Sequence, residues 1–387
     1  MESVTFYKGV APIRRIRERV EEIIHCNPFL AGRFHLPNEK GAHIQFKVPC
    51  IDAGTLFALN LDDHFQVYGN VSISADDEFS TICNTVGKLP KLSVPNAAEC
   101  LASYGAVFRV AILQHPSRTQ FALYFALCHG IGDGHCYYSL YNMLNTSVSP
   151  YRMVFDRVKS YQSDVWDLLP DVAVDLRKDE NMGLPVFGSL IGIVACVLAA
   201  TVRDTLVSLV YGKSVWGIVE GPSPEWIQEQ KAQASRKSGF VSTNDCFVSW
   251  FLTKTQCDYG SMAVNTRNRV QNVTNVHFGN YLTVLYYQRE DFSSASLIRE
   301  SIAGQVLKRQ ITTAPFGQDW KIPKRIGFVT NWASFYNDVN IEGCELIKHL
   351  PVMDLKQPSP FATCIIFAER KGSWKVLETQ ANRELRL

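Results

Sequence analysis

The feature that most constrains the fold is a pair of apolar runs joined by a short polar turn. Residues 106–114, "AVFRVAILQ", and residues 120–128, "QFALYFALC", are typical of two strands, and the turn between them reads "HPSRT". In the second run both alternating faces are mostly apolar, which predicts a central strand that is covered on both sides. A glycine-rich loop, residues 129–134, and a helical pattern follow it. We therefore expect a covered sheet with a loop at the end of a central strand.

The rest of the chain predicts mixed α/β structure in both halves. Residues 13–25 place apolar side chains at helical spacing, and "NPFLAGRF" then predicts a break and a short strand that starts near Phe29. Further helices are expected near residues 224–234, 241–255 and 296–308, and strands near 261–270, 278–287, 325–332 and 361–369. We divide the chain into an N-terminal lobe, residues 1–150, a crossover, residues 151–223, and a C-terminal lobe, residues 224–387.

Composition excludes several classes of function. Of the 387 residues, 46% are hydrophobic and 20% are charged, so the chain can bury large cores. The formal net charge is only +2, and the basic residues are scattered, which gives no reason to expect nucleic acid as a partner. The eleven cysteines include no C-x-x-C pair, which favours reduced thiols in a cytoplasmic protein. The N-terminus shows no secretory signal.

One segment does not fit this description of a soluble chain. Residues 181–202 carry no charge and have about the length of a membrane-spanning helix. Three interpretations stay open: a buried or substrate-facing helix, peripheral contact with a membrane through residues 181–212, and a hairpin inserted into the membrane. Contact with a membrane would favour a long-chain acceptor.

His129 and Asp133 are the first candidates for chemistry. A histidine can accept and return a proton near neutral pH, and a position just past a strand would hold its backbone rigidly beside a cleft. Glycines at 130, 132 and 134 leave space around the ring. Asp133 would orient that ring or bind an arginine. From these residues alone, a structural histidine in a glycine turn is an equal alternative.

Four further stretches accompany this motif. In chain order the five are "NPFLAGRF" (27–34), "CHGIGDG" (128–134), "VSTNDCFVSWF" (241–251), "VNTRNRV" with "FGNY" (264–270 and 278–281) and "FVTNW" (328–332). Together they resemble the BAHD family of acyl-CoA-dependent acyltransferases, within the chloramphenicol acetyltransferase-like superfamily. That superfamily also contains condensation domains and wax ester synthases. No single stretch is decisive. The resemblance rests on the occurrence of all five in the order that the family has.

The resemblance implies a two-lobed fold, in which each lobe is a mixed sheet covered by helices and the active-site channel runs between the lobes. It implies an acyltransferase with acyl-CoA as co-substrate, no bound cofactor and no metal. His129 would be the general base. Thr330 would donate a hydrogen bond to the oxyanion, although a structural strand threonine is an equal alternative. Asp133 would pair with Arg267 and brace the loop, and Gly134 would keep the channel open.

Three more residues follow from the same resemblance. Trp332 would support the site by packing. Ser242 and Thr243 are helix caps by their sequence context, and in the family this element lies near the pantetheine arm of CoA. The family's "D-F-G-W-G" element is reduced here to "NDVNIEG", which keeps Asp338. This indicates a divergent member.

The acceptor stays open at this point. A small or lipophilic alcohol is the first expectation, and an amine is the alternative. Two other functions also stay open: a non-catalytic protein that binds a hydrophobic ligand between the lobes, and a lipid-directed acyltransferase of the wax ester synthase kind. Two-lobed relatives are often monomeric, so we expect a monomer.

Overall fold

The apolar hairpin forms the middle of a five-stranded mixed sheet. The computed structural model describes residues 1–37, 44–49, 60–169, 215–236, 239–312, 325–355 and 361–380. Strands β5 (Phe108–Gln114) and β6 (Gln120–Leu127) pair antiparallel, and the sheet order is β11-β1-β6-β5-β4. Every residue of β6 after its first is buried, as a strand covered on both faces requires.

The other three strands of this sheet come from distant parts of the chain. Strand β1 (Glu2–Lys8) pairs antiparallel with β6 on one side and with β11 (Glu345–Val352) on the other. Strand β4 (Phe65–Tyr68) lies parallel to β5 at one edge. The N-terminal sheet is therefore completed by a strand from the last quarter of the chain.

The predicted first helix is present, but the short strand expected near Phe29 is wrong. Helix α1 (Ile13–Cys26) buries apolar side chains at helical spacing. After it Pro28 starts the 3-10 helix η1 (Pro28–Ala31), because proline fixes φ and suits a first helical position. The other elements of this half are β2 (Arg33–His35), β3 (Gln45–Lys47), η2 (Leu61–Asp63), α2 (Phe79–Val86), α3 (Ala97–Ser103), α4 (Gly134–Asn142) and α5 (Tyr161–Asp167).

The second sheet has six strands in the order β7-β13-β12-β10-β8-β9. Its strands are β7 (Val215–Val219), β8 (Tyr259–Asn265), β9 (Leu282–Gln288), β10 (Ile326–Asn331), β12 (Ala362–Arg370) and β13 (Ser373–Gln380). Strand β10 is parallel to both β8 and β12, whereas the outer pairs are antiparallel. The carboxyl ends of β8 and β10 therefore lie at the same edge of the sheet.

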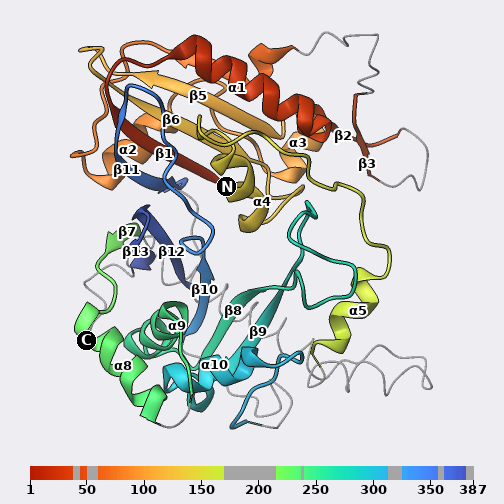
Figure 1. Cartoon of the computed structure of the whole chain (residues 1–387), viewed down its shortest axis with the longest axis vertical. Coiled ribbons are helices and arrows are strands. Elements are labelled where there is room, and N and C mark those ends of the chain that lie inside the picture. The colour runs from red at the N-terminus through yellow and green to blue at the C-terminus, as the bar shows by residue number, and fades with distance from the viewer. Residues whose placement is uncertain are drawn as a thin grey trace, which may run out of the picture.

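Two cross-strand glycines let a helix pack closely on this sheet. Gly260 of β8 and Gly327 of β10 are neighbours in register. A Cβ at either position would lie 2.5 or 2.4 Å from a methyl carbon of Leu252 on helix α9 (Thr243–Lys254). Figure 1 shows α9 in this lobe beside α8 (Pro224–Arg236) and α10 (Ala295–Ala303). The short helix η3 (Arg289–Phe292) precedes α10.

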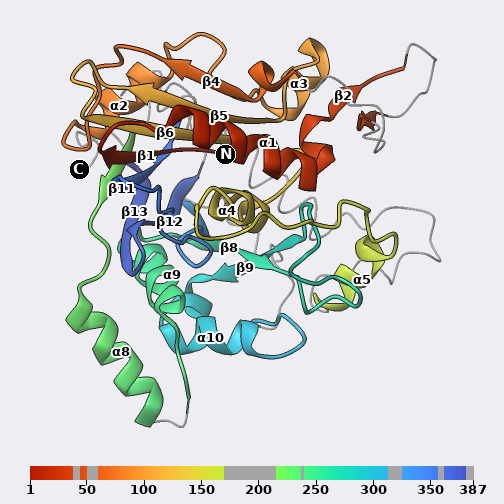
Figure 2. The ribbon, with the colours of Figure 1, turned by 45° about the horizontal axis from the view of Figure 1, so that its top comes forward.

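Helix α4 lies between the two sheets (Figure 2). Its Tyr138 packs edge-on against Trp332, just after β10, with 6.4 Å between the ring centroids. The loop that leads from β10 to β11 also binds the N-terminal lobe, since Asn142 Nδ2 donates to the carbonyl of Phe335 at 3.0 Å. One hydrophobic core cluster includes residues of both sheets. The predicted two-lobed α/β fold is thus confirmed.

The uncharged segment 181–202 lies outside the described residues. Among the helices that the structure does describe, none is both long enough and apolar enough to cross a bilayer.

Candidate active site between the lobes

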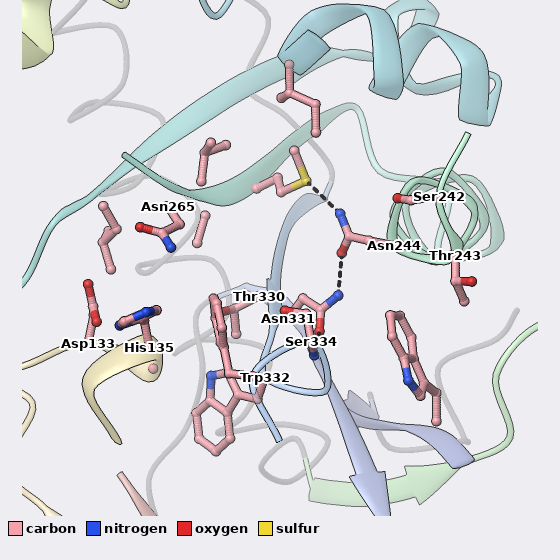
Figure 3. A pocket seen from close by; sticks show the side chains of 18 of the residues that line it. Asp133, His135, Ser242, Thr243, Asn244, Asn265, Thr330, Asn331, Trp332 and Ser334 are labelled. Carbon is pink, nitrogen blue, oxygen red and sulfur yellow. Dashed lines mark hydrogen bonds between the residues drawn. The ribbon is translucent and has the colours of Figure 1, made fainter. Parts of the chain in front are cut away.

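A cavity of about 500 Å³ lies between the two lobes. The N-terminal lobe contributes Asp133, Gly134 and His135 from the start of α4, and the C-terminal lobe contributes the remaining lining residues (Figure 3). They include the carboxyl ends of β8 and β10, represented by Asn265 and Thr330. The cavity therefore lies where a helix N-terminus of one lobe faces a strand edge of the other.

Asp133 starts helix α4. Its backbone is extended, and its Oδ1 accepts a hydrogen bond from the Cys136 amide at 3.1 Å, which is an N-cap. The loop before it is close-packed. A Cβ at Gly132 would lie 2.9 Å from the Cβ of Cys136 and 3.0 Å from the ring of Phe278. A residue larger than glycine at 132 would therefore displace the cap.

Asp133 also forms a buried ion pair with the other lobe. Arg267 Nη1 lies 2.7 Å from Asp133 Oδ2, and their side chains are 0% and 4% exposed. The same oxygen accepts from the Tyr281 amide at 3.0 Å. Arg267 also donates through Nη2 to the Gly279 carbonyl at 2.9 Å and through Nε to the His277 carbonyl at 3.1 Å. The pair is thus satisfied on both sides, as a buried ion pair must be to persist.

The second arginine of this stretch has a different place. Arg269 donates to the carbonyls of Gly304 and Ile302, at 2.7 and 2.6 Å, and so binds the end of α10. Of these two arginines, only Arg267 contacts the loop of residues 129–134.

His129 follows β6 at the interface of the lobes. Its carbonyl accepts a hydrogen bond from Asn280 Nδ2 at 2.8 Å, which ties the loop to the "FGNY" stretch. Gly130 beside it is packed tightly, since a Cβ there would lie 2.7 Å from the Cβ of Ala97. The His129 side chain is exposed, and His129 is not among the residues that line the 500 Å³ cavity.

The histidine that lines the cavity is His135, which the sequence analysis did not single out. It is the second residue of α4 and is half-buried, and its ring packs edge-on against Phe335 at 5.5 Å between centroids. Its Nδ1 is buried and has no hydrogen-bond partner among the residues that the structure describes. Burial, together with the positive charge of Arg267, lowers the pKa of His135 to about 4. The signal in the sequence is its position directly after "DG", at a predicted helix start.

Ser242 and Thr243 line the cavity at the start of α9. Ser242 is the N-cap of a capping box: its Oγ accepts from the Asp245 amide at 3.3 Å, and its own amide donates to Asp245 Oδ2 at 2.7 Å. Thr243 Oγ1 accepts from Lys231 Nζ at 2.9 Å. Arg299 forms an ion pair with Asp245 at 2.6 Å. Lys231 and Arg299 also line the cavity. Because Asp245 balances the charge of Arg299, the net positive charge of this part comes from Lys231.

Thr330 and Trp332 line the cavity at the end of β10. Both are half-buried. The amide of Trp332 donates to the Ile366 carbonyl at 2.8 Å, which fixes the indole beside α4. A Cβ at Gly134 would lie 3.5 Å from Trp332 Cδ1, in ordinary contact. Position 134 therefore has room for a methyl group.

Asp133, His135 and Cys136 bring potential metal-ligand atoms within 4.8 Å of one another. Arg267 already donates to two of them, through Nη1 to Asp133 Oδ2 and through Nη2 to Cys136 Sγ at 3.1 Å. A guanidinium cation so close to the cluster opposes the binding of a metal cation.

No protein-family model matches the chain, and no curated protein matches it significantly by sequence. Solved structures do match it. Vinorine synthase superposes with a TM-score of 0.57 at 13% identity, covering 99% of this chain and 87% of that chain. TRI101 of F. sporotrichioides, solved with Coenzyme A and T-2, gives 0.56 at 11% identity, covering 98% and 90%. The first condensation domain of the CDA synthetase gives 0.54 at 12% identity, covering 100% and 86%.

The chain has the fold that vinorine synthase, TRI101 and this condensation domain share. The fold expected from the five sequence stretches is thereby confirmed, and it extends over nearly the whole chain.

Proposed function

We propose that this protein transfers an acyl group from acyl-CoA to a hydroxyl group of a small or lipophilic acceptor. The observation that carries the proposal is the buried ion pair between Asp133 and Arg267. It fixes the loop that bears His129 to the lobe that supplies most of the cavity. The fold supports the same reaction, because TRI101, with a comparable architecture, was solved with Coenzyme A.

In the proposed reaction His129 acts as general base. Its imidazole takes the proton of the acceptor hydroxyl while the oxygen attacks the thioester carbonyl. The tetrahedral oxyanion accepts a hydrogen bond from Thr330, and it then collapses as the carbon–sulfur bond breaks. His129 returns its proton to the CoA sulfur, so the products are an ester and free CoA. General-base help of this kind contributes about 10²–10⁴-fold.

The remaining cavity residues suit the donor. The apolar wall of the cavity is formed by side chains such as Met262, Leu282 and Ile302, which fit an acyl chain or the pantetheine arm. Lys231, beside Ser242 and Thr243, supplies positive charge for the phosphates of CoA.

We further propose that the protein acts as a monomer, with lobes 1–150 and 224–387 joined by the crossover 151–223. Strand β11 crosses over to complete the sheet of the first lobe, and β7 of the crossover completes the sheet of the second. An amine is the alternative acceptor. Sedimentation analysis tests the monomer, and co-sedimentation with phospholipid vesicles tests membrane contact through residues 181–212. Vesicle binding that is lost when 181–212 is deleted would favour the lipid-directed function instead.

The decisive screen measures free thiol released from acyl-CoAs of graded chain length, in the presence of pooled alcohols and, separately, pooled amines. Thiol release that depends on an alcohol supports the proposal. Release with amines alone would assign N-acylation. Tight binding of a hydrophobic ligand, without thioester consumption by any donor, would contradict the proposal and support the non-catalytic alternative.

A further inference from the structure

His135 brings an imidazole into the cavity from the first turn of α4, six residues after His129. It lies two residues after Asp133, on the first turn of α4, and Figure 3 shows it beside Asp133, on the same side of the cavity as Asn265. Thr330, the expected oxyanion donor, lines the same cavity from the other lobe. The ends of the two side chains therefore border one volume, into which the thioester of a bound donor would project.

The ring of His135 has a polar edge that none of the described residues uses. Nδ1 is buried and has no hydrogen-bond partner in the described part of the chain. A proton on Nδ1 would leave a buried N–H unsatisfied, which is costly. The tautomer with the proton on Nε2 leaves Nδ1 as an unpaired acceptor, which buried sites tolerate somewhat better than an unpaired N–H, and it directs the N–H away from the buried edge. Because the residue is only half-buried and lines the cavity, that N–H is available to a ligand.

The environment of His135 makes it a donor rather than a base. Burial and the charge of Arg267 lower the pKa of His135 to about 4, so the ring is neutral at pH 7 and weakly basic. A general base works best with a pKa near the working pH. A neutral imidazole, in contrast, can polarise a carbonyl group by donating a hydrogen bond without losing its proton. His135 is thus suited to donating a hydrogen bond rather than to removing a proton.

We infer that His135 donates a hydrogen bond from Nε2 to the carbonyl oxygen of the bound thioester, beside Thr330, and stabilises the oxyanion formed there. The inference rests on the proposed acyl transfer and adds a second oxyanion donor to it. His135 keeps its proton throughout, so the bonds made and broken in the transfer are unchanged. The donor comes from the N-terminal lobe, and Thr330 comes from the C-terminal lobe, so the oxyanion site requires both lobes to be in place.

The test replaces the imidazole by one side chain that can donate a hydrogen bond and by another that cannot. His135→Gln places an amide N–H near the position of Nε2, whereas His135→Phe keeps the ring shape and removes the donor. With an acyl-CoA that the wild type uses, we expect kcat of His135→Phe to fall about 10²-fold, the typical effect of losing one oxyanion donor. The KM for acyl-CoA should change far less. His135→Gln should retain kcat within about tenfold of the wild type.

The matched control is His25→Phe, the same change at an exposed histidine at the end of α1, which should leave kcat unchanged. If His135→Phe does not fold, His135→Leu replaces it in the comparison. Full kcat in a folded apolar variant, or an equal loss in His135→Gln, would overturn the inference while leaving the proposed function intact. A wild type that releases no thiol with any donor and acceptor would overturn both.

Discussion

The strongest structural prediction concerns Arg267→Met. This change removes the guanidinium but keeps an unbranched apolar side chain of similar reach. The wild-type group is fully buried and donates to Asp133, to Cys136 and to the carbonyls of Gly279 and His277. Of the described groups, methionine leaves the Asp133 carboxylate with the amides of Cys136 and Tyr281 as partners. A buried negative charge then lies without its counter-charge.

The expected loss follows from that isolated charge. Breaking a buried ion pair by removing one partner costs about 3–5 kcal/mol. At about 1.4 kcal/mol per tenfold change, the ratio of folded to unfolded protein would fall roughly 10²–10⁴-fold. Replacing both partners, in Asp133→Asn with Arg267→Met, should recover part of this loss, because the asparagine side chain still accepts from the Cys136 amide and carries no charge.

The assay is urea unfolding followed by tryptophan fluorescence. The matched control is Arg14→Met, since Arg14 is 93% exposed and its ion pair with Glu18 lies on the surface. Surface pairs of this kind contribute about 0–1 kcal/mol. If Arg267→Met lost no more stability than Arg14→Met, the ion pair would not hold the lobes as described. An equal loss in the single and double variants would show that the uncompensated charge is not the cause.

Three further predictions follow from single contacts. Asn280→Ala removes the hydrogen bond to the His129 carbonyl, so kcat in the thiol-release assay should fall about tenfold, and an unchanged kcat would show that this tether does not position the loop. Ser242→Ala removes the N-cap of α9 and should cost about 1 kcal/mol in thermal unfolding, whereas no cost would show that Asp245 alone caps the helix. Burial lowers the pKa of His349 to about 3, below its usual value of about 6.5. Between about pH 6.5 and pH 3 the unfolded chain therefore binds one proton more than the folded chain. The free energy of unfolding should fall as the pH is lowered through this range, by about 1.4 kcal/mol per pH unit. His349→Phe should flatten this dependence in urea titrations at pH 7 and 5, and an equal slope in both proteins would contradict the assignment.

Local patterns predicted those parts of the fold that local forces determine. The hairpin of β5 and β6 follows from two apolar runs, and the start of α9 follows from the capping sequence at Ser242. The same holds for α1, whose buried face has helical spacing. The resemblance paired Asp133 with Arg267, and the structure contains that contact. The catalytic roles of His129 and Thr330 stay predictions.

The features that sequence reasoning missed depend on distant contacts. Strand β1 is a short run near the N-terminus, and only pairing with β6 and β11 makes it an inner strand of a sheet. Strand β11 comes from the far end of the chain, and no local signal shows which sheet it joins. His135 stands in an ordinary helix start, and its chemistry arises from burial, from Arg267 and from a cavity that the other lobe completes.

The measurement that tests the central claim most directly is the rate of thiol release by His129→Ala. It should be made with the acyl-CoA and acceptor that the wild type uses best, and with His25→Ala as control. We predict that kcat falls about 10²–10⁴-fold in His129→Ala, while the control and the folded state of both variants are unaffected. Turnover by His129→Ala equal to that of the wild type would contradict the account.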